Sequence, residues 1–197
     1  MQQLHILLEQ ISRRAVWIGG LALLFAAFIV TIDVFMRKFF SITMSGSDEV
    51  SGYVFAASTT WAYSFCLLHR ANVRIDAFYN FLPRAVCAVL DVVGAILLLI
   101  YMGVLTERAT HVFLESLANG SVSVTTLQTP LWIPQLAWVC GLYLFLITLI
   151  FVCLHALIGL LRGDLVRVQL TAGVRSLEDE IMEETHGMGI NSKMGGA

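Results

Sequence analysis

The chain has 197 residues, 58% of them apolar, with a mean hydropathy of +0.81. Soluble domains are about 45–50% apolar, so this composition excludes an ordinary soluble protein and leaves room for one membrane-embedded bundle. The formal net charge of −2 provides no global field that would point to nucleic acid or to an anionic ligand.

Four apolar segments are long enough to cross a bilayer, whose hydrocarbon core needs roughly 20 helical residues. They run from about Ala15 to Phe39, Val50 to Leu68, Arg84 to Leu105 and Leu131 to Leu161. These runs are continuous rather than alternating, which disfavours the strands of a membrane barrel. We therefore predict an all-α integral membrane protein with four transmembrane helices over residues 15–161.

The basic residues predict the orientation of these helices. An N-terminal segment (1–14), the 69–84 loop and a mostly flexible tail (162–197) hold nine of the 12 Lys and Arg residues, and the other two loops hold three. Such an excess marks the cytoplasmic side of an inner-membrane protein. We expect both termini in the cytoplasm, and the first apolar run to be an uncleaved anchor rather than a signal peptide.

Local signals mark where the helices begin and end. Ser45 to Glu49 offers a capping side chain and two acidic residues to the start of the second helix. The third helix keeps helical spacing beyond Leu105 as far as Asn119-Gly120, a favourable C-terminal cap. We expect this helix to project into the periplasm, followed by an extended loop rich in Thr and Val.

Three ionisable residues are expected within the membrane, where a charge is a functional hypothesis by default. Asp33 and Arg37 stand four residues apart and can neutralise each other. Asp91, in the third helix, can have either a structural or a functional role, and the sequence does not distinguish between the two. None of the acidic residues lies at the midplane, where the coupling-ion site of a transporter is expected.

The remaining polar residues predict no catalytic or metal site. Glu107, His111 and Glu115 form a stripe on one helix face, which is more typical of a solvated or partner-facing surface than of a metal site. The four cysteines lie in apolar stretches without metal-ligand spacing. No nucleophile or phosphate-binding motif is present. We predict a protein that is not an enzyme and carries no cofactor.

The second helix has a face of small residues. Gly52, Ala56 and Thr60 recur at four-residue spacing, and Trp61 lies beside them near the middle of the span. Small residues at this spacing allow another helix to approach closely. The face is predicted to be either a contact within the bundle or an interface with a second protein.

Three sequence features occur together in these four spans: GSDEVSGYVF opening the second helix, HRANVRIDAFYNFLP in the cytoplasmic loop and TTLQTPLWIP before the fourth helix. In this combination, the chain resembles the DctQ-type small membrane subunit of tripartite ATP-independent periplasmic (TRAP) transporters from about Arg13 to Leu161. One departure is Asn72, where the family often has histidine.

The resemblance implies a function that depends on partners. In the family, a periplasmic solute-binding protein delivers solute to a large membrane subunit, which carries it inward by ion-driven symport. The small subunit braces the large one and helps to dock the binding protein. Carried over, Asp48 and Glu49 would lie at the periplasmic face, Arg74 and Asp76 at the cytoplasmic face. The same resemblance places four residues in the outer loop: Thr125, Thr126, Pro130 and Pro134.

Two other functions are compatible with the residues. His69 and His155 both lie toward the cytoplasmic side and can hold a haem between the second and fourth helices, as in a membrane anchor of a respiratory enzyme. A visible absorption spectrum separates this alternative. The other is a stand-alone small transporter, although no repeat or interrupted helix of the usual kind is present. Copurification of a large hydrophobic partner would argue against the stand-alone transporter.

Overall fold

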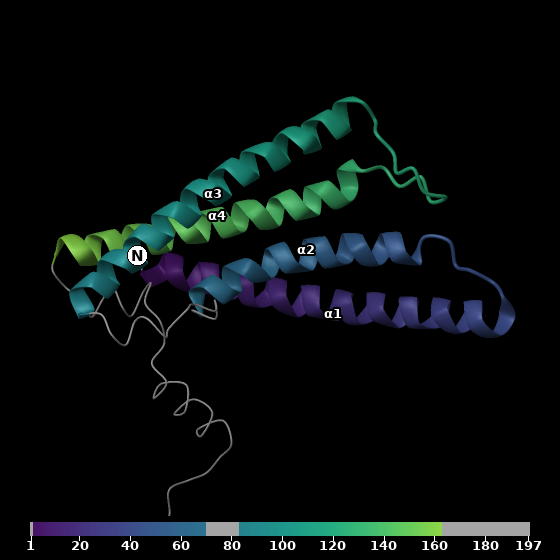
Figure 1. Cartoon of the computed structure of the whole chain (residues 1–197), viewed down its shortest axis with the longest axis horizontal. Coiled ribbons are helices and arrows are strands. Elements are labelled where there is room, and N and C mark those ends of the chain that lie inside the picture. Colours follow the sequence, from purple (N-terminus) through teal and green to yellow (C-terminus); the bar gives the residue numbers. More distant parts are fainter. Residues whose placement is uncertain (1, 70–82, 163–197) are drawn as a thin grey trace, which may run out of the picture.

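The computed structural model describes residues 2–69 and 83–162, and these form four α-helices (Figure 1). The helices are α1 (Gln2–Phe40), α2 (Ser47–Leu68), α3 (Arg84–Ala118) and α4 (Trp132–Leu161). Within these two stretches, β-type pairing is confined to an isolated bridge between Val122 and Pro130. The predicted all-α fold is confirmed.

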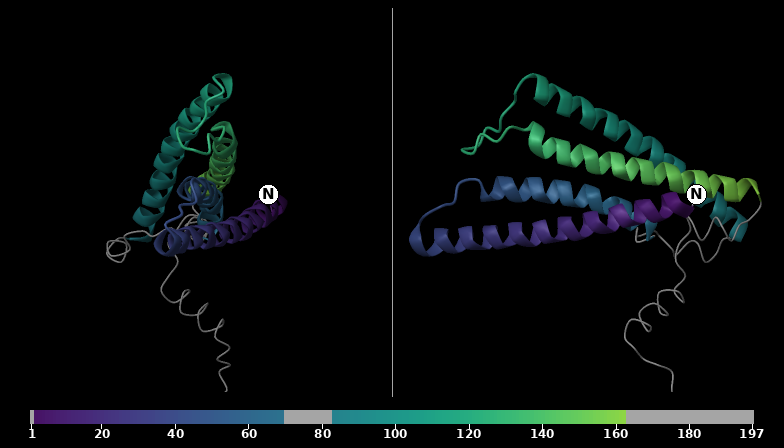
Figure 2. Two further views of the ribbon diagram at one scale, coloured as in Figure 1. Left: turned by 90° about the vertical axis from the view of Figure 1, so that its right-hand side faces the viewer. Right: turned by 180° about the vertical axis from the view of Figure 1, so that it is seen from behind.

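The helices form an open array rather than a closed bundle. α2 lies between α1 and α4. It runs antiparallel to α1, and α4 packs against α3 on its other side (Figure 1). The two hairpins, α1–α2 and α3–α4, diverge toward the end that carries the 41–46 and 119–131 loops (Figures 1 and 2). Each of the outermost helices, α1 and α3, therefore has only one neighbouring helix along most of its length.

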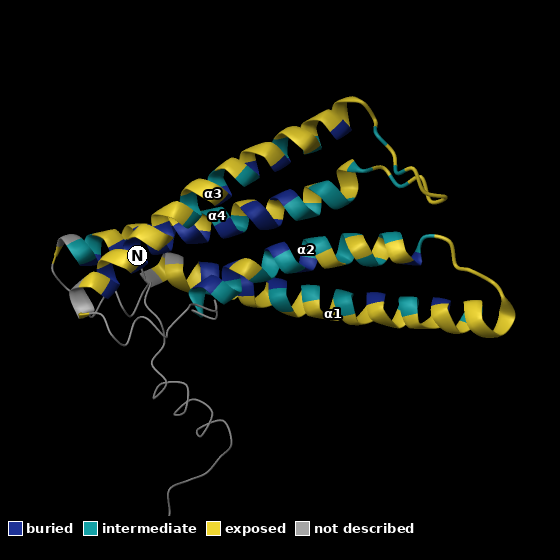
Figure 3. Ribbon diagram, viewed as in Figure 1, coloured by how far each residue is buried: buried dark blue, intermediate teal, exposed yellow. Residues whose placement is uncertain are grey.

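The core lies along α4. Leu142, Leu149 and Ala156 are at most 1% exposed and recur at seven-residue spacing, so one stripe of the helix is fully covered. Within an 18-residue apolar stretch of each helix, 44% of the residues are buried in α4, compared with 28% in α3 and 11% in α1. Figure 3 shows the same gradient as dark blue along α4 and yellow along α1 and α3.

Three of the four helices are long and apolar enough to cross a membrane: α1, α3 and α4. This makes the chain a multi-pass membrane protein. α2 does not meet that criterion because it carries six Ser and Thr residues and two acidic residues in its first turn. The expected fourth span is a helix of suitable length, 22 residues, but its membrane crossing stays a prediction.

α1 extends further than the predicted first span. The helix begins at Gln2 rather than near Ala15, so residues 2–14 continue it instead of forming a separate segment. These residues are mainly good helix formers, without Gly or Pro. Leu8 and Ser12 are 4% and 0% exposed, so this extension packs into the structure. Of the expected C-terminal tail, all but Arg162 lies outside the described residues.

Two helix ends test the capping signals. α3 ends as predicted, because the amides of Gly120 and Ser121 donate to the carbonyls of Leu117 and Ser116, and Gly120 adopts a left-handed φ of 57°. The expected side-chain cap of α2 is wrong. The cap residue is Gly46, at a φ of 104°, and no side chain bonds to the free amides. The left-handed turn that glycine permits brings the chain into α2 instead.

Candidate functional site

The 119–131 loop lies against the N-terminal end of α2. The hydroxyl of Thr125 donates a hydrogen bond to Oε2 of Glu49, and the hydroxyls of Ser45 and Thr126 share another. Leu127 occupies the space beside Gly46, where any Cβ would collide with it. The loop therefore ties the α3–α4 hairpin to the α1–α2 hairpin where the two diverge.

The two acidic residues at the start of α2 have different surroundings. Oε1 of Glu49 also accepts a hydrogen bond from the Tyr53 hydroxyl, at 2.5 Å. The Thr125 hydroxyl, and then that of Tyr53, hold the pKa of the Glu49 carboxyl below its ordinary value of 4.5. Asp48 is exposed, and its carboxylate has no hydrogen bond or ion pair within the described part of the chain. Of these two carboxylates, that of Asp48 is therefore the one left available to a partner.

The other residues predicted in the outer loop are not all in this cluster. Thr125 and Thr126 are exposed and contact the start of α2 through their hydroxyls. Pro130 is exposed and pairs with Val122 across the loop. Pro134 lies half-buried in the first turn of α4. The sequence order placed these four residues together, and the fold brings only the two threonines to Ser45 and Glu49.

The predicted small-residue face of α2 divides into two parts. Thr60 is buried against Gly141 of α4, and the indole nitrogen of Trp61 donates to the carbonyl of Ala137 at 2.8 Å. This half is a contact within the protein. Gly52 is exposed, with no atom within 4 Å of the position of a Cβ, and Ala56 is half-buried. This half leaves a helix surface that no other described residue covers at Gly52.

Two close helix contacts were not predicted. A Cβ on Gly141 would lie 2.7 Å from Cδ1 of Trp61, so only glycine allows α4 to approach α2 this closely. A Cβ on Gly19 would lie 3.2 Å from the Cβ of Ser58, whose hydroxyl donates to the Gly19 carbonyl at 3.1 Å. The signal was present, because isolated glycines in apolar helices often mark such contacts.

Asp33 lies in α1, about two helical turns before its end at Phe40, and its carboxylate bonds to the 41–46 turn that leads into α2. Its carboxylate accepts a bond from the Arg37 guanidinium at 2.6 Å and one from the backbone amide of Met44 at 2.6 Å. The side chain is 1% exposed. The pairing expected from the spacing of Asp33 and Arg37 is confirmed, and the same carboxylate also holds the 41–46 turn at Met44.

The remaining candidates are scattered. Asp91 is 2% exposed in α3, and Arg74 and Asp76 lie outside the described residues. His111 approaches Glu107 to 4.0 Å on the exposed face of α3. The ring of His69 contacts that of Phe65 in a tilted arrangement, with centroids 4.1 Å apart, and His155 contacts Phe151 in the same way at 4.3 Å. No group of three metal-ligating side chains occurs among the residues that the structure describes.

Together, these features define a class of protein: a helical, multi-pass membrane protein with two long apolar faces and a polar loop that joins its hairpins. The sequence matches the family described as "Tripartite ATP-independent periplasmic transporters, DctQ component" over residues 15–170. The chain belongs to this family and is therefore a membrane component of a TRAP transporter, as its motifs suggested. No curated protein and no solved structure matches it.

Proposed function

We propose that this chain is the non-catalytic small permease subunit of its transporter. In this role it braces the large membrane subunit and helps to dock the periplasmic solute-binding protein during ion-driven uptake. The observation that carries the proposal is the openness of the helix array. In an 18-residue apolar stretch of α1 only 11% of the residues are buried, and the exposed side chains of this helix include Trp17, Phe25, Phe28 and Phe35. A large apolar surface of this kind needs lipid or protein to cover it.

The uncovered face of α2 is the proposed contact with the large subunit. Gly52, Phe55 and Ala56 lie at helical spacing, and Phe55 is 60% exposed. Thr60 and Trp61 contact α4, so we now place them within the bundle and assign the partner interface to this other face. The small side chains at Gly52 and Ala56 would allow a helix of the large subunit to approach closely.

The proposed membrane arrangement has α2 as a fourth span, with both termini in the cytoplasm of a bacterial inner membrane. Six residues join α2 to α1, and the two helices run side by side (Figure 1). At 1.5 Å per residue α2 is about 33 Å long, enough to cross with its neighbour. A periplasm-dependent reporter should be active when fused after Asn119 and silent after Arg162. The reverse pattern would contradict this orientation.

The interface with the large subunit is tested by Gly52→Leu. This change should leave the stability of the isolated chain intact, because open space surrounds the position. It should reduce the amount of large subunit that copurifies with the chain. Gly94→Leu on α3, another open position, is the matched control. Normal copurification with Gly52→Leu would show that this face contacts lipid instead.

Docking is proposed to involve Asp48, the exposed acidic residue beside the 119–131 loop. Asp48→Asn should raise the binding-protein concentration needed for half-maximal uptake in liposomes containing both membrane subunits. Excess binding protein should restore the rate, because mass action offsets weaker association. The affinity of the binding protein for solute is the control and should not change. Unaltered uptake at every concentration would remove Asp48 from the docking site, and uptake by this chain alone would contradict the subunit role.

A further inference from the structure

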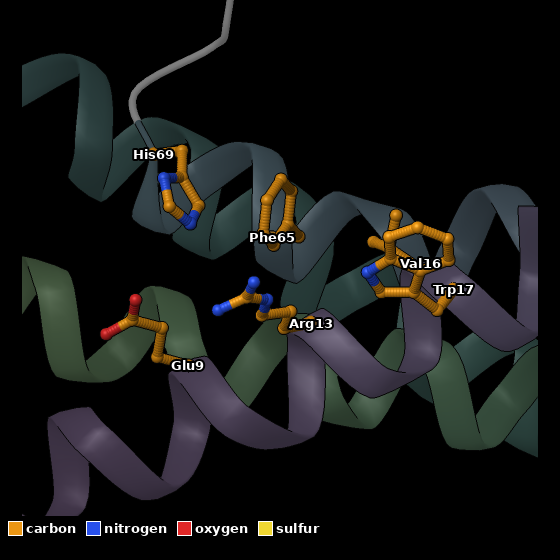
Figure 4. Close-up of a pocket in the computed structure, with 6 residues that line it drawn as sticks. All are labelled: Glu9, Arg13, Val16, Trp17, Phe65 and His69. Carbon is orange, nitrogen blue, oxygen red and sulfur yellow. The ribbon is translucent and has the colours of Figure 1, made fainter. Parts of the chain in front are cut away.

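Two hollows flank Arg13 and Trp17 near the end of α1 that is remote from the 119–131 loop. The first, shown in Figure 4, has a volume of about 350 Å³. It is lined by Glu9, Arg13, Val16, Trp17, Phe65 and His69. The second has a volume of about 450 Å³ and is lined by Gln10, Arg13, Arg14, Trp17 and Ile18. Arg13 and Trp17, one helical turn apart, belong to both hollows.

The two arginines bring positive charge to this place without an acidic partner. In Figure 4 the guanidinium of Arg13 extends between α1 and the side chains of Phe65, on α2, and His69, which follows α2. Across residues 2–69 and 83–162, no hydrogen bond or ion pair engages Arg13 or Arg14. No carboxylate lines the second hollow. Glu9 lines only the first, and it lies 3.8 Å from the imidazole of His5.

The length of α1 places the arginines at the level of the lipid headgroups. Arg13 and Arg37 belong to one continuous helix, and the 24 residues of rise between them correspond to about 36 Å. The hydrocarbon core is about 30 Å thick. Between these two levels, the single charged residue from Ala15 to Met36 is Asp33, which pairs with Arg37. Trp17 is 74% exposed, as expected of an indole at the interface.

We propose that Arg13, Arg14 and Trp17 form a binding site for the phosphodiester headgroup of an anionic phospholipid of the phosphatidylglycerol type. Two guanidinium groups provide the paired donors that a phosphate accepts. Trp17 then lies beside the glycerol, and the acyl chains run along the exposed apolar side chains that follow on α1, beginning with Leu21. This assigns a structural lipid to the α1 end of the subunit.

The carboxylate of Glu9 helps to distinguish a zwitterionic headgroup from an anionic one. A zwitterionic ethanolamine lipid would place its ammonium group against Glu9 and would gain from that charge. An anionic headgroup seated in the second hollow is repelled by Glu9 or is indifferent to it. Because the hollow without a carboxylate is also the one that both arginines line, the structure favours the anionic lipid.

The test is native mass spectrometry of the full chain in detergent, titrated with phosphatidylglycerol and, separately, with phosphatidylethanolamine. R13Q and R14Q should each weaken phosphatidylglycerol binding about fivefold, and the double variant more. Lys38→Gln and Arg108→Gln remove equal charge at other exposed positions and are the matched controls. Thermal unfolding should be unchanged in the arginine variants, because both side chains are exposed.

Other outcomes overturn the proposal in identifiable ways. E9Q should leave phosphatidylglycerol binding unchanged or tighter, and weaker binding would instead indicate an ammonium headgroup at Glu9. Millimolar inorganic phosphate should not displace the lipid, and displacement would identify a free-anion site. If R13Q/R14Q retains the lipid but no longer copurifies with the large subunit, the arginines contact protein and the lipid site is excluded.

Discussion

α1 and α4 are both long, apolar helices able to span a membrane, yet they occupy opposite positions in the protein. Within an 18-residue apolar stretch of each helix, 11% of the residues are buried in α1 and 44% in α4. The difference arises from neighbours: α4 lies between α2 and α3, whereas α1 packs mainly on α2. Apolar content alone therefore measures suitability for the membrane and does not reveal which helix is central. The helix that remains open is the one with surface to offer lipid or a partner.

The largest effect should come from adding bulk where α4 meets α2. Gly141→Leu drives a side chain into Thr60 and Trp61, and overpacking should lower the free energy of unfolding by about 3 kcal/mol. Gly20→Leu on α1 adds the same bulk where nothing lies within 4 Å, and should be nearly neutral. Unfolding in mixed micelles with increasing dodecyl sulfate measures both variants. Equal losses at the two glycines would break the distinction between the helices.

Asp33 is a charged residue that is buried on a mostly open helix, α1. Asp33→Asn removes the ion pair to Arg37 and should cost about 1–2 kcal/mol, less than for a fully buried pair because Arg37 is half exposed. The same micelle titration applies. The double variant Asp33→Asn/Arg37→Gln should lose less than the sum of the single changes. Strict additivity would mean that the two side chains do not stabilise one another.

A smaller effect is expected at Trp61, which joins α2 to α4. Trp61→Phe removes the hydrogen bond to the Ala137 carbonyl and should cost about 1 kcal/mol. Trp17→Phe is the matched change on α1, where the indole is 74% exposed, and it should alter the unfolding free energy very little. A larger loss at Trp17 than at Trp61 would reverse the assignment of the covered and open helices.

The smallest effect should lie outside the spans, at Glu49, which precedes the apolar part of α2. Its pKa is lowered on folding, so its contribution to stability is complete above the unfolded value near 4.5 and is lost as pH falls through the folded value. The difference in melting temperature between the protein and Glu49→Gln should be constant from pH 7 to 5 and shrink below that range. A difference that grows on acidification would contradict the hydrogen bonds to Thr125 and Tyr53.

The sequence was sufficient for features that depend on neighbouring residues. The Asp33–Arg37 pair, one turn apart, and the cap at Asn119-Gly120 are local, and both are present. The family likewise followed from three short motifs in order. Contacts between distant segments were beyond this reasoning. Glu49 and Thr125 are 76 positions apart, and only the folded loop shows that this carboxylate is engaged whereas Asp48 is not.

The small-residue face of α2 shows the same limit in one element. Periodicity grouped Thr60 with Gly52 and Ala56 on one face, with Trp61 beside them, and gave no reason to separate Thr60 and Trp61, which contact α4, from Gly52. The two groups differ because of Gly141 on α4, whose lack of a side chain allows Thr60 and Trp61 of α2 to pack closely against α4. A helix face becomes an internal or an external surface according to its neighbours, so one chain's periodicity predicts the face without predicting what covers it.

The short turn between α1 and α2 has a consequence for biosynthesis. Among the four described helices, α2 is the one without a stretch apolar enough to count as a membrane span by composition, and its hydroxyls return hydrogen bonds to its own carbonyls, as Thr59 does to Phe55 and Thr60 to Ala57. With six residues between them, α1 and α2 leave the ribosome in immediate succession. A nascent α2 that inserts poorly alone can therefore enter the bilayer as the second arm of a helical hairpin, carried by the hydrophobicity of the first.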